Sequence, residues 1–150
     1  LMSDGIVKIA LPGAGGRMGG MLIREITAAK DLQLVAATDQ PGSPVIGKDA
    51  GLVAGLRKNG VIIGDVPEKL FEKADVVIWD GMFTRKELRF KTGWGHSSIQ
   101  QGIDFFSNLN CDKIIISHHA PYRTDAELAI IEQSLPSGIH LAKDGQVLKL

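Results

Sequence analysis

The fold is decided by residues 7–19, VKIALPGAGGRMG. The β-branched and apolar run from Val7 to Leu11 predicts a buried strand that ends at Pro12. From Arg17 onward, apolar side chains recur at helical spacing, at Met18, Leu22, Ile23 and Ile26. A short strand is therefore expected to pass through a glycine-rich turn directly into a helix.

Three glycines of this turn have the spacing of a phosphate-binding loop. The first lets the chain turn sharply, the second lets backbone approach a pyrophosphate, and the third allows close packing of helix on strand. The helix N-terminus adds N–H donors and a partial positive charge. An acidic residue twenty positions after the last glycine ends the second expected strand, where it can accept hydrogen bonds from an adenosine ribose. We therefore expect a dinucleotide to contact Gly13, Ala14, Gly15, Gly16, Arg17, Met18, Gly19 and Asp39. A turn needed only for packing is the alternative.

Strands and helices alternate along the rest of the chain. The expected strands are 7–11, 32–38, 61–63, 74–79, 113–116 and 139–141. Capping-box patterns at Ser97–Gln100 and Thr124–Glu127 predict two helix starts. Asp144-Gly145, followed by 147–148, predicts a C-terminal β-hairpin. The pattern predicts one α/β domain over residues 1–150, a three-layer αβα and Rossmann-like arrangement with a mainly parallel sheet in the order 3-2-1-4-5-6.

Charge and cysteine content exclude several classes of protein. The 150 residues carry 17 basic and 17 acidic side chains, so their zero formal charge argues against nucleic-acid or acidic-membrane partners. Cys111 is alone and cannot form an internal disulfide. No apolar stretch approaches the ~20 residues of a membrane span, and no signal-peptide pattern begins the chain. We expect a cytoplasmic protein, of an oligomeric state that the sequence does not predict.

The two halves of the chain differ in composition. Every aromatic residue and every histidine lies after Leu70, whereas twelve of the eighteen glycines precede position 71. No linker rich in Pro, Gly or Ser separates the halves, so the difference falls within one expected domain.

Acidic and histidine side chains follow two expected strands of the second half. Asp80 follows 74–79, His118 follows 113–116, and His96 precedes a helix. Because neighbouring parallel strands bring their C-terminal ends together, Asp80 and His118 are expected to share one crevice. Asp80 and His118 are thus candidate ligands of zinc or another divalent metal, and His96 is a candidate remnant of a catalytic site. Polar loop residues without a metal are the more common outcome of such a pattern.

Residues 5–78 resemble dihydrodipicolinate reductase, an enzyme family of bacterial lysine biosynthesis. The similarity lies in Lys8–Ala10, Gly13–Gly19, Leu34–Ala37, Gly42–Pro44 and Gly47–Gly51. The resemblance implies that the glycine loop holds NADH or NADPH, that Arg17 lies near the phosphates and that Asp39 meets the adenosine ribose. Gln40 stands where the family often has a basic residue, which favours NADH.

The resemblance does not extend to the family's catalytic segments. After Ile78 the Asp-Phe-Thr segment, the Gly-Thr-Thr nicotinamide loop and the His-His-Arg-His stretch are not found, and Ala120–Arg123 does not continue that motif after His118-His119. The family's substrate and tetramerisation domain is likewise not expected within residues 1–150. Reductase activity is therefore not expected.

Residues 74–150 resemble the C-terminal part of metallo-β-lactamase-fold hydrolases, in the branch of phosphodiesterases and ribonuclease Z. The similar segments are Ala74–Thr84, Gly93–Ser98 and Ser117–Asp125. The resemblance implies that Asp80 is a bridging metal ligand, His118 a terminal ligand, and His96 a group that contacts phosphate or donates a proton. The hydrolase also needs a His-x-His-x-Asp-His motif, and residues 1–73 contain no histidine. Only weak zinc binding is expected.

Together these patterns predict an engineered or recombined chimera. A reductase-like half, 1–75, would be joined to a hydrolase-like half, 76–150. We expect the chain to bind NADH or NADPH without complete catalysis, and hence not to be an enzyme. The alternatives are a remnant of a metal-dependent phosphodiesterase and a purely structural hybrid without ligand.

Overall fold

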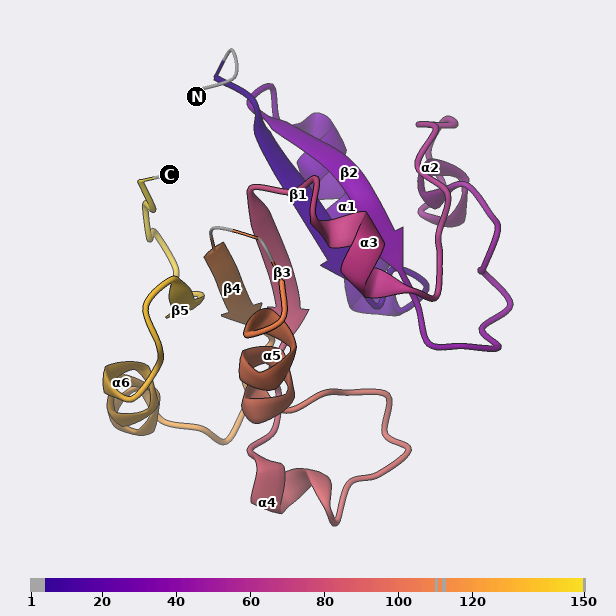
Figure 1. Ribbon diagram of the computed structural model, residues 1–150. Helices are drawn as coiled ribbons and strands as arrows, with labels where there is room; N and C mark the ends of the chain where they lie inside the picture. Colours follow the sequence, from indigo (N-terminus) through magenta and orange to yellow (C-terminus); the bar gives the residue numbers. More distant parts are fainter. Residues whose placement is uncertain (1–4, 110, 112, 150) are drawn as a thin grey trace. The chain divides into compact units, whose positions relative to one another are not determined.

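The computed structural model describes residues 5–109, 111 and 113–149, apart from the side chains of Glu68 and Leu70. Its elements (Figure 1) are β1 (Val7–Pro12), α1 (Arg17–Ala28), β2 (Leu32–Thr38), α2 (Ala50–Val53), α3 (Pro67–Phe71), β3 (Val76–Asp80), α4 (Arg85–Leu88), α5 (Ile99–Phe106), β4 (Lys113–Ser117), α6 (Asp125–Gln133) and β5 (Ile139–Leu141). The strand order is β2-β1-β3-β4-β5, and the pairs β1–β2, β1–β3 and β4–β5 are parallel. This confirms the predicted α/β, Rossmann-like class.

The chain forms two compact units. Unit 1 comprises Leu1–Val77 and unit 2 comprises Ile78–Leu150. This division lies close to residue 75, where the two family resemblances were expected to meet. Strand β3 crosses this division. Its first two residues pair with Ile9 and Ala10 of β1, and its last three belong to unit 2.

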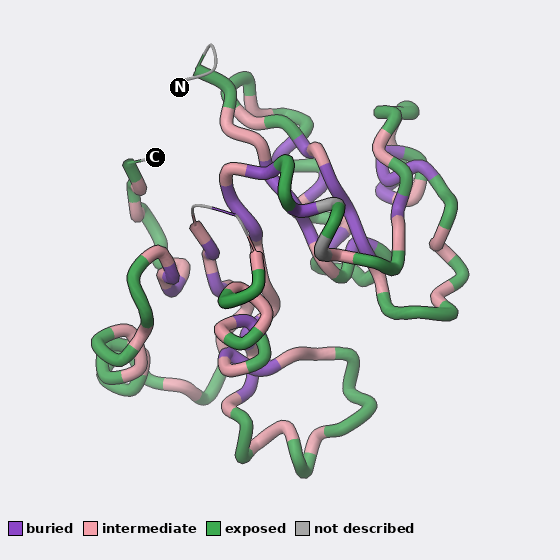
Figure 2. The backbone as a smooth tube through the Cα atoms, in the orientation of Figure 1, coloured by how far each residue is buried: buried purple, intermediate pink, exposed green. Residues whose placement is uncertain are grey.

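In unit 1, helices cover both faces of the β1–β2 pair, α3 in front and α1 behind (Figure 1). β1 and β2 run in register from Val7 opposite Leu32 to Pro12 opposite Thr38, with one irregularity after Ile9. Buried residues concentrate in these strands (Figure 2) and on the inner face of α1. The main ones are Ile9, Ala10, Leu11, Ile23, Ile26, Leu34, Ala36, Ala37, Ile63, Phe71 and Val77. Alanine on the strands leaves room for the helices to approach the sheet.

The expected edge strand at 61–63 is reduced to isolated bridges. Residues 61–63 exchange hydrogen bonds with residues 47–50, from Ala50 N to Val61 O and from Ile63 N to Lys48 O. Gly64 alone reaches β2, where it bridges Thr38 in parallel. The backbone groups of residues 61–63 bond to residues 47–50 and are not available to extend the sheet. The observed sheet therefore has the predicted order 3-2-1-4-5-6 without the strand numbered 3, which was expected at 61–63.

Unit 2 is built on β4, β5 and the end of β3. Ile114 and Ile116 of β4 pair with Ile139 and Leu141 of β5, and all four side chains are buried. The second strand of the predicted hairpin does not form. The Asp144-Gly145 turn is present, with Gln146 N donating to Lys143 O, but residues 146–149 form no strand. The turn forms, but β5 pairs only with β4 among the described strands, and 147–148 does not add to its other edge.

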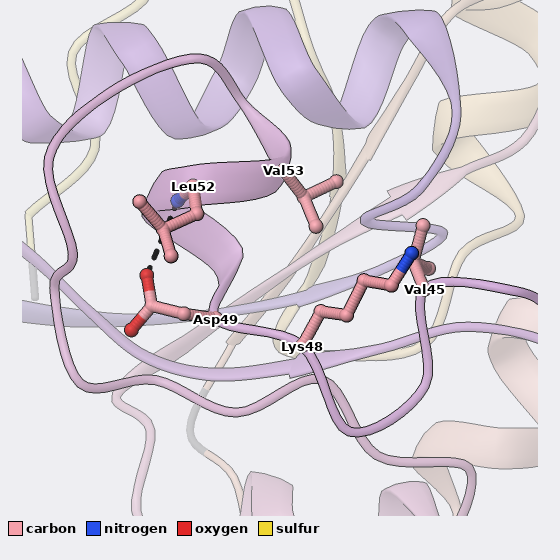
Figure 3. Close-up of a pocket in the computed structure, with 5 residues that line it drawn as sticks. All are labelled: Val45, Lys48, Asp49, Leu52 and Val53. Atoms are coloured by element: carbon pink, nitrogen blue, oxygen red, sulfur yellow. Dashed lines mark hydrogen bonds between the residues drawn. The ribbon is translucent and has the colours of Figure 1, made fainter.

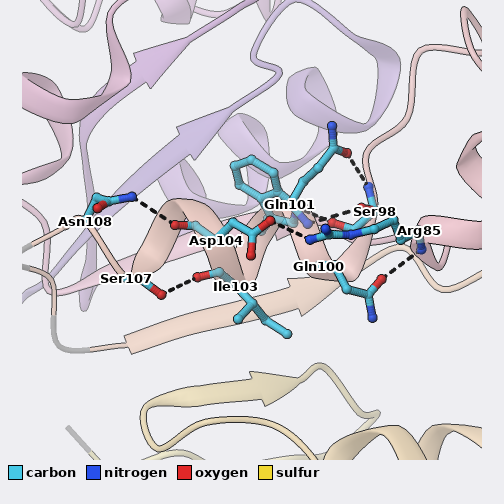
Figure 4. A network of polar contacts seen from close by, with 9 residues as sticks. Arg85, Ser98, Gln100, Gln101, Ile103, Asp104, Ser107 and Asn108 are labelled. Atoms are coloured by element: carbon cyan, nitrogen blue, oxygen red, sulfur yellow. Dashed lines mark hydrogen bonds and ion pairs between the residues drawn. The ribbon is translucent and has the colours of Figure 1, made fainter.

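Helices α4 and α5 are linked by a polar network (Figure 4). The side chains of Arg85 and Asp104 lie 2.5 Å apart, and Gln100 accepts a hydrogen bond from Arg85 N at 2.8 Å. The capping box of α5 uses Ser98 and Gln101, one residue later than predicted from Ser97. Helix α4 was not predicted from the sequence, although Thr84 and Glu87 form a complete capping box there. Within the described residues no helix is both long and apolar enough to cross a membrane.

Candidate functional site

The glycine loop of unit 1 joins β1 to α1, as the sequence predicted. Gly13 has φ +74°, a left-handed conformation that favours glycine because a side chain is strained there. A Cβ on Gly19 would lie 2.3 Å from Gly13 O and 2.8 Å from Ala14 Cα, both backbone atoms. The first and third glycines therefore have the roles of sharp turn and close packing.

Gly16 differs from its neighbours. Its φ is −76°, which any residue adopts, and a Cβ there would meet only Gly13 O, at an ordinary 3.5 Å. By contrast, a Cβ on Gly15 would lie 2.2 Å from Asp39 Oδ2. No contact with the described residues therefore explains a glycine at position 16, which lies on the exposed side of the loop.

The start of α1 is open to an anion. Gly16 is the N-cap and provides no side-chain hydrogen bond to the helix. The first turn of a helix leaves backbone N–H groups without partners inside the helix, and its dipole favours negative charge. Arg17 and Met18, which begin the helix, are both exposed. This end of α1 can donate hydrogen bonds to a phosphate.

Asp39 lies over the same loop, at the end of β2. Its Oδ2 accepts hydrogen bonds from Gly15 N at 3.0 Å and from Ser43 Oγ at 3.2 Å, and its Oδ1 accepts one from Gln40 N at 2.7 Å. The carboxylate thus stands beside the loop and presents acceptor oxygens to whatever binds there.

A shallow pocket of about 470 Å³ opens near this acid (Figure 3). Val45, Leu52 and Val53 line it with aliphatic side chains, and Lys48 and Asp49 complete its wall. Asp49 is held in place as the N-cap of α2, because its Oδ1 accepts a hydrogen bond from Leu52 N at 3.2 Å. Val45 also faces Gly15, where a Cβ would lie 2.6 Å from its Cγ2. The pocket is therefore adjacent to the glycine loop, and the sequence carried no signal for it.

The acidic and histidine side chains of unit 2 converge as expected. Oδ2 of Asp80 lies 2.8 Å from Nδ1 of His96 and 3.3 Å from Nδ1 of His118. The two imidazole rings have centroids 4.7 Å apart. One ligand atom from each of the three residues fits within a span of 4.8 Å. We call this group the histidine cluster.

His118 has φ +60°, and no other non-glycine among the described residues has a positive φ. A left-handed backbone is uncommon outside glycine, costs about 1 kcal/mol or more, and persists only where surrounding structure holds it. Such strain gathers at functional sites. Its neighbour His119 points elsewhere, with Nε2 3.1 Å from Ala142 O.

A family comparison then decides what unit 1 is. The model of the dihydrodipicolinate reductase N-terminus matches residues 7–92, more than half of the 150-residue chain. The chain belongs to this family. The match begins with β1, includes the glycine loop and Asp39, and continues past residue 75 to residue 92, beyond the end of α4.

Three curated relatives are named 4-hydroxy-tetrahydrodipicolinate reductase. The chain is 51% identical over 77 residues to 4-hydroxy-tetrahydrodipicolinate reductase of Rhizobium rhizogenes, covering 51% of the chain and 28% of the relative. It is 48% identical over 71 residues to the enzyme of Alkalilimnicola ehrlichii, covering 47% of the chain and 27% of the relative. Identity to the enzyme of Citrifermentans bemidjiense is 42% over 73 residues, 49% of the chain and 27% of the relative. The match spans little more than a quarter of these reductases.

The predicted site residues of this reductase-family chain thus fall into two places. Gly13–Gly19 and Asp39 come together in unit 1, and Asp80, His96 and His118 come together in unit 2. Sequence reasoning missed the pocket beside Val45 and the residues around the histidine cluster. Glu87 could have been found from the sequence, because Thr84-x-x-Glu87 has the pattern of a capping box and so indicates the start of helix α4.

Proposed function

We propose that unit 1 binds a nicotinamide dinucleotide, NADH or NADPH, at the glycine loop. The observation that carries this proposal is Gly16: no contact in the part of the chain that the structure describes requires a glycine there, and the missing side chain leaves room for a diphosphate beside the uncapped start of α1. Asp39 would accept hydrogen bonds from the adenosine ribose, and the aliphatic pocket beside Val45 suits an adenine ring. When bound, the nicotinamide would supply or accept a hydride.

Gly16→Ala tests the proposal directly. The added methyl would fill the approach to the diphosphate while costing helix α1 no more than about 1 kcal/mol at its N-cap. We expect NADH affinity, measured by calorimetry, to fall about tenfold or more, which is about 1.4 kcal/mol. Gly20→Ala is the matched control, because a Cβ there meets nothing within 4 Å. Wild-type affinity in Gly16→Ala, or no NADH binding by the wild type at millimolar concentration, would contradict the proposal.

We propose further that NADH binds more tightly than NADPH. A 2′-phosphate would approach the Asp39 carboxylate, and the next residue, Gln40, offers no positive charge. Like charges repel at such distances. Asp39→Asn keeps the shape and removes the charge, so it should shift the ratio of NADPH to NADH affinity toward NADPH. An unchanged ratio would reject this role for Asp39.

We propose that the chain completes no reduction by itself and that its two halves have different origins. Two observations support a chimera: the change of composition after Leu70, and the division between units at Val77. The family match to residue 92 counts against a boundary as early as residue 75. An assay of NADH oxidation with 4-hydroxy-tetrahydrodipicolinate tests the first statement, and turnover would refute it.

The histidine cluster supports a second candidate function, a remnant of a metal-dependent phosphodiesterase. Asp80, His96 and His118 supply three ligand atoms, the number that catalytic zinc sites take from protein. Their nitrogen and carboxylate donors suit zinc, and a bound zinc ion would supply a Lewis acid. Zinc analysis after purification and turnover of a bis-aryl phosphate ester test this candidate. Activity that survives His118→Ala would exclude the mechanism. If the phosphodiesterase assay shows no turnover and the NADH titration shows no binding, the remaining interpretation is a purely structural hybrid without ligand.

A further inference from the structure

A partly buried ion pair joins the segment that follows Asp80 at the end of β3 to the segment that begins with His118 after β4. Downstream of β3, Glu87 lies in α4; downstream of β4, Arg123 lies just before α6. Nη2 of Arg123 is 2.6 Å from Oε2 of Glu87. The hydroxyl of Tyr122 donates to Oε1 of the same carboxylate at 3.1 Å. Both oxygens of Glu87 are therefore engaged by the loop that follows His118.

Each end of this pair is fixed to the backbone. Oε2 of Glu87 also accepts a hydrogen bond from Thr84 N at 2.7 Å, which closes the capping box of α4. On the other side, Arg123 N donates to Ala120 O at 2.9 Å, and Ala120 is fully buried two residues after His118. Movement of either side chain would therefore move its loop.

Partial burial of the two side chains strengthens the ion pair. The Arg123 side chain is only 7% exposed and that of Glu87 is 27% exposed. Nε of Arg123 is buried without a hydrogen-bond partner among the described residues, whereas Nη2 donates a hydrogen bond to Glu87. A buried charge that loses its partner is strongly destabilised, and the loop would have to move to solvate it.

We propose that Glu87 and Arg123 are positioning residues for the histidine cluster. Their ion pair sets the spacing between the loop after β3 and the loop after β4, and it holds the strained backbone of His118 so that the imidazole stays beside Asp80. The positioning of His118 beside Asp80 is inferred from the Glu87–Arg123 ion pair alone and does not require a metal. Its consequence for metal binding rests on the second candidate function.

Two measurements on the full chain test the proposal. Ring-to-ring nuclear Overhauser effects between His96 and His118 report the cluster geometry without metal, because the centroids are 4.7 Å apart. Titration with Co²⁺, followed by its visible absorption bands, reports affinity and ligand geometry. Loss of groups that orient metal ligands typically weakens metal binding 10–100-fold.

The variants are Arg123→Met, which removes the charge, and Glu87→Gln, which keeps a residue that can close the capping box. We expect both to lose the His96–His118 Overhauser effect and to bind Co²⁺ at least about tenfold more weakly, with altered bands. Arg123→Lys should recover part of both signals. Asp104→Asn is the matched control, because it removes the exposed ion pair with Arg85 in the same unit. Both readouts should be unchanged in it.

The possible outcomes separate the two proposals. If the Overhauser effect and the Co²⁺ spectrum persist in folded Glu87→Gln, the positioning role is overturned. If the wild type binds no Co²⁺ but both variants lose the Overhauser effect, the positioning role holds and the metal function fails. Should Arg123→Met not fold, Glu87→Gln and Arg123→Lys still decide the question.

Discussion

The glycine loop of unit 1 and the histidine cluster of unit 2 occupy equivalent places, each at the C-terminal end of a parallel strand, but they are made differently. The loop offers backbone: no side chain caps α1, and glycines shape the turn. The cluster offers side chains from Asp80, His96 and His118, held by loops that are tied to each other. A site made of backbone is encoded in local spacing, whereas a site made of side chains depends on contacts distant in sequence.

The largest expected effect tests whether the backbone site depends on close packing. Gly19→Ala would place a methyl 2.3 Å from Gly13 O, which cannot move without distorting the loop. We expect unit 1 to lose about 2 kcal/mol, within the range for overpacked positions. Amide hydrogen exchange in α1 and β1 measures the loss. Unchanged exchange would mean that the loop is more adaptable than its geometry implies.

A second effect tests the charge dependence of unit 2. Burial raises the pKa of Glu87, but Thr84 and Arg123 outweigh it and lower the pKa from 4.5 to about 2. The resulting stabilisation is therefore fully present above about pH 4.5 and is lost as the pH falls toward 2. The shift would correspond to about 3 kcal/mol if unscreened, and partial exposure reduces this to about 1–2 kcal/mol.

The measurement is the urea midpoint between pH 2 and pH 6, followed by fluorescence of Trp79 and Trp94, which both lie in unit 2. Glu87→Gln should remove this part of the acid dependence. If wild type and variant lose stability in parallel as the pH falls, the carboxylate is not the group responsible.

A smaller loss of stability is expected when the N-cap of helix α6 is removed. Thr124 caps α6 through Oγ1, which accepts a hydrogen bond from Glu127 N at 3.3 Å, while Glu127 closes the box from its side chain. Thr124→Ala should cost about 1 kcal/mol, the usual value of such a cap. Chemical denaturation followed by tryptophan fluorescence checks it. Thr124→Ser, which keeps the hydroxyl, should stay near the wild type.

The smallest effect has the opposite sign. Gly20 lies inside α1 with open space where a Cβ would stand. Gly20→Ala should therefore stabilise unit 1 by about 0.5 kcal/mol, since glycine in a helix costs backbone entropy. Slower amide exchange in α1 is the expected result. A faster exchange would indicate an unseen constraint on this face of the helix.

The same contrast explains what the sequence could predict. The strand, loop, helix and acid around Gly13 and Asp39 depend on spacing alone, and all four were predicted. The convergence of Asp80 with His118 followed from the rule that parallel strands end together. The place of His96 in this site was implied only by the hydrolase resemblance, because the nearby bridge between Phe83 and Ser98 pairs segments that have no periodic signal.

Errors arose where two local patterns competed or a distant partner decided. Ser97 and Ser98 each have glutamine three residues later, so spacing could not choose between them. The choice of Ser98 follows from the backbone of Phe83, whose O accepts a hydrogen bond from Ile99 N at 2.9 Å. Likewise, residues 61–63 have the composition of a strand, but their backbone groups form hydrogen bonds with residues 47–50 and not with the edge of the sheet.

Gly16 allows selection for folding to be distinguished from selection for ligand binding, which usually act on the same glycines of such a loop. A methyl group at Gly13 or Gly19 harms the fold itself, so those positions are held by the need to fold, whatever the chain binds. At Gly16 a side chain would disturb the fold little. If sequences descended from this chain keep glycine there, ligand binding is still under selection, and if they replace it, that selection has been lost.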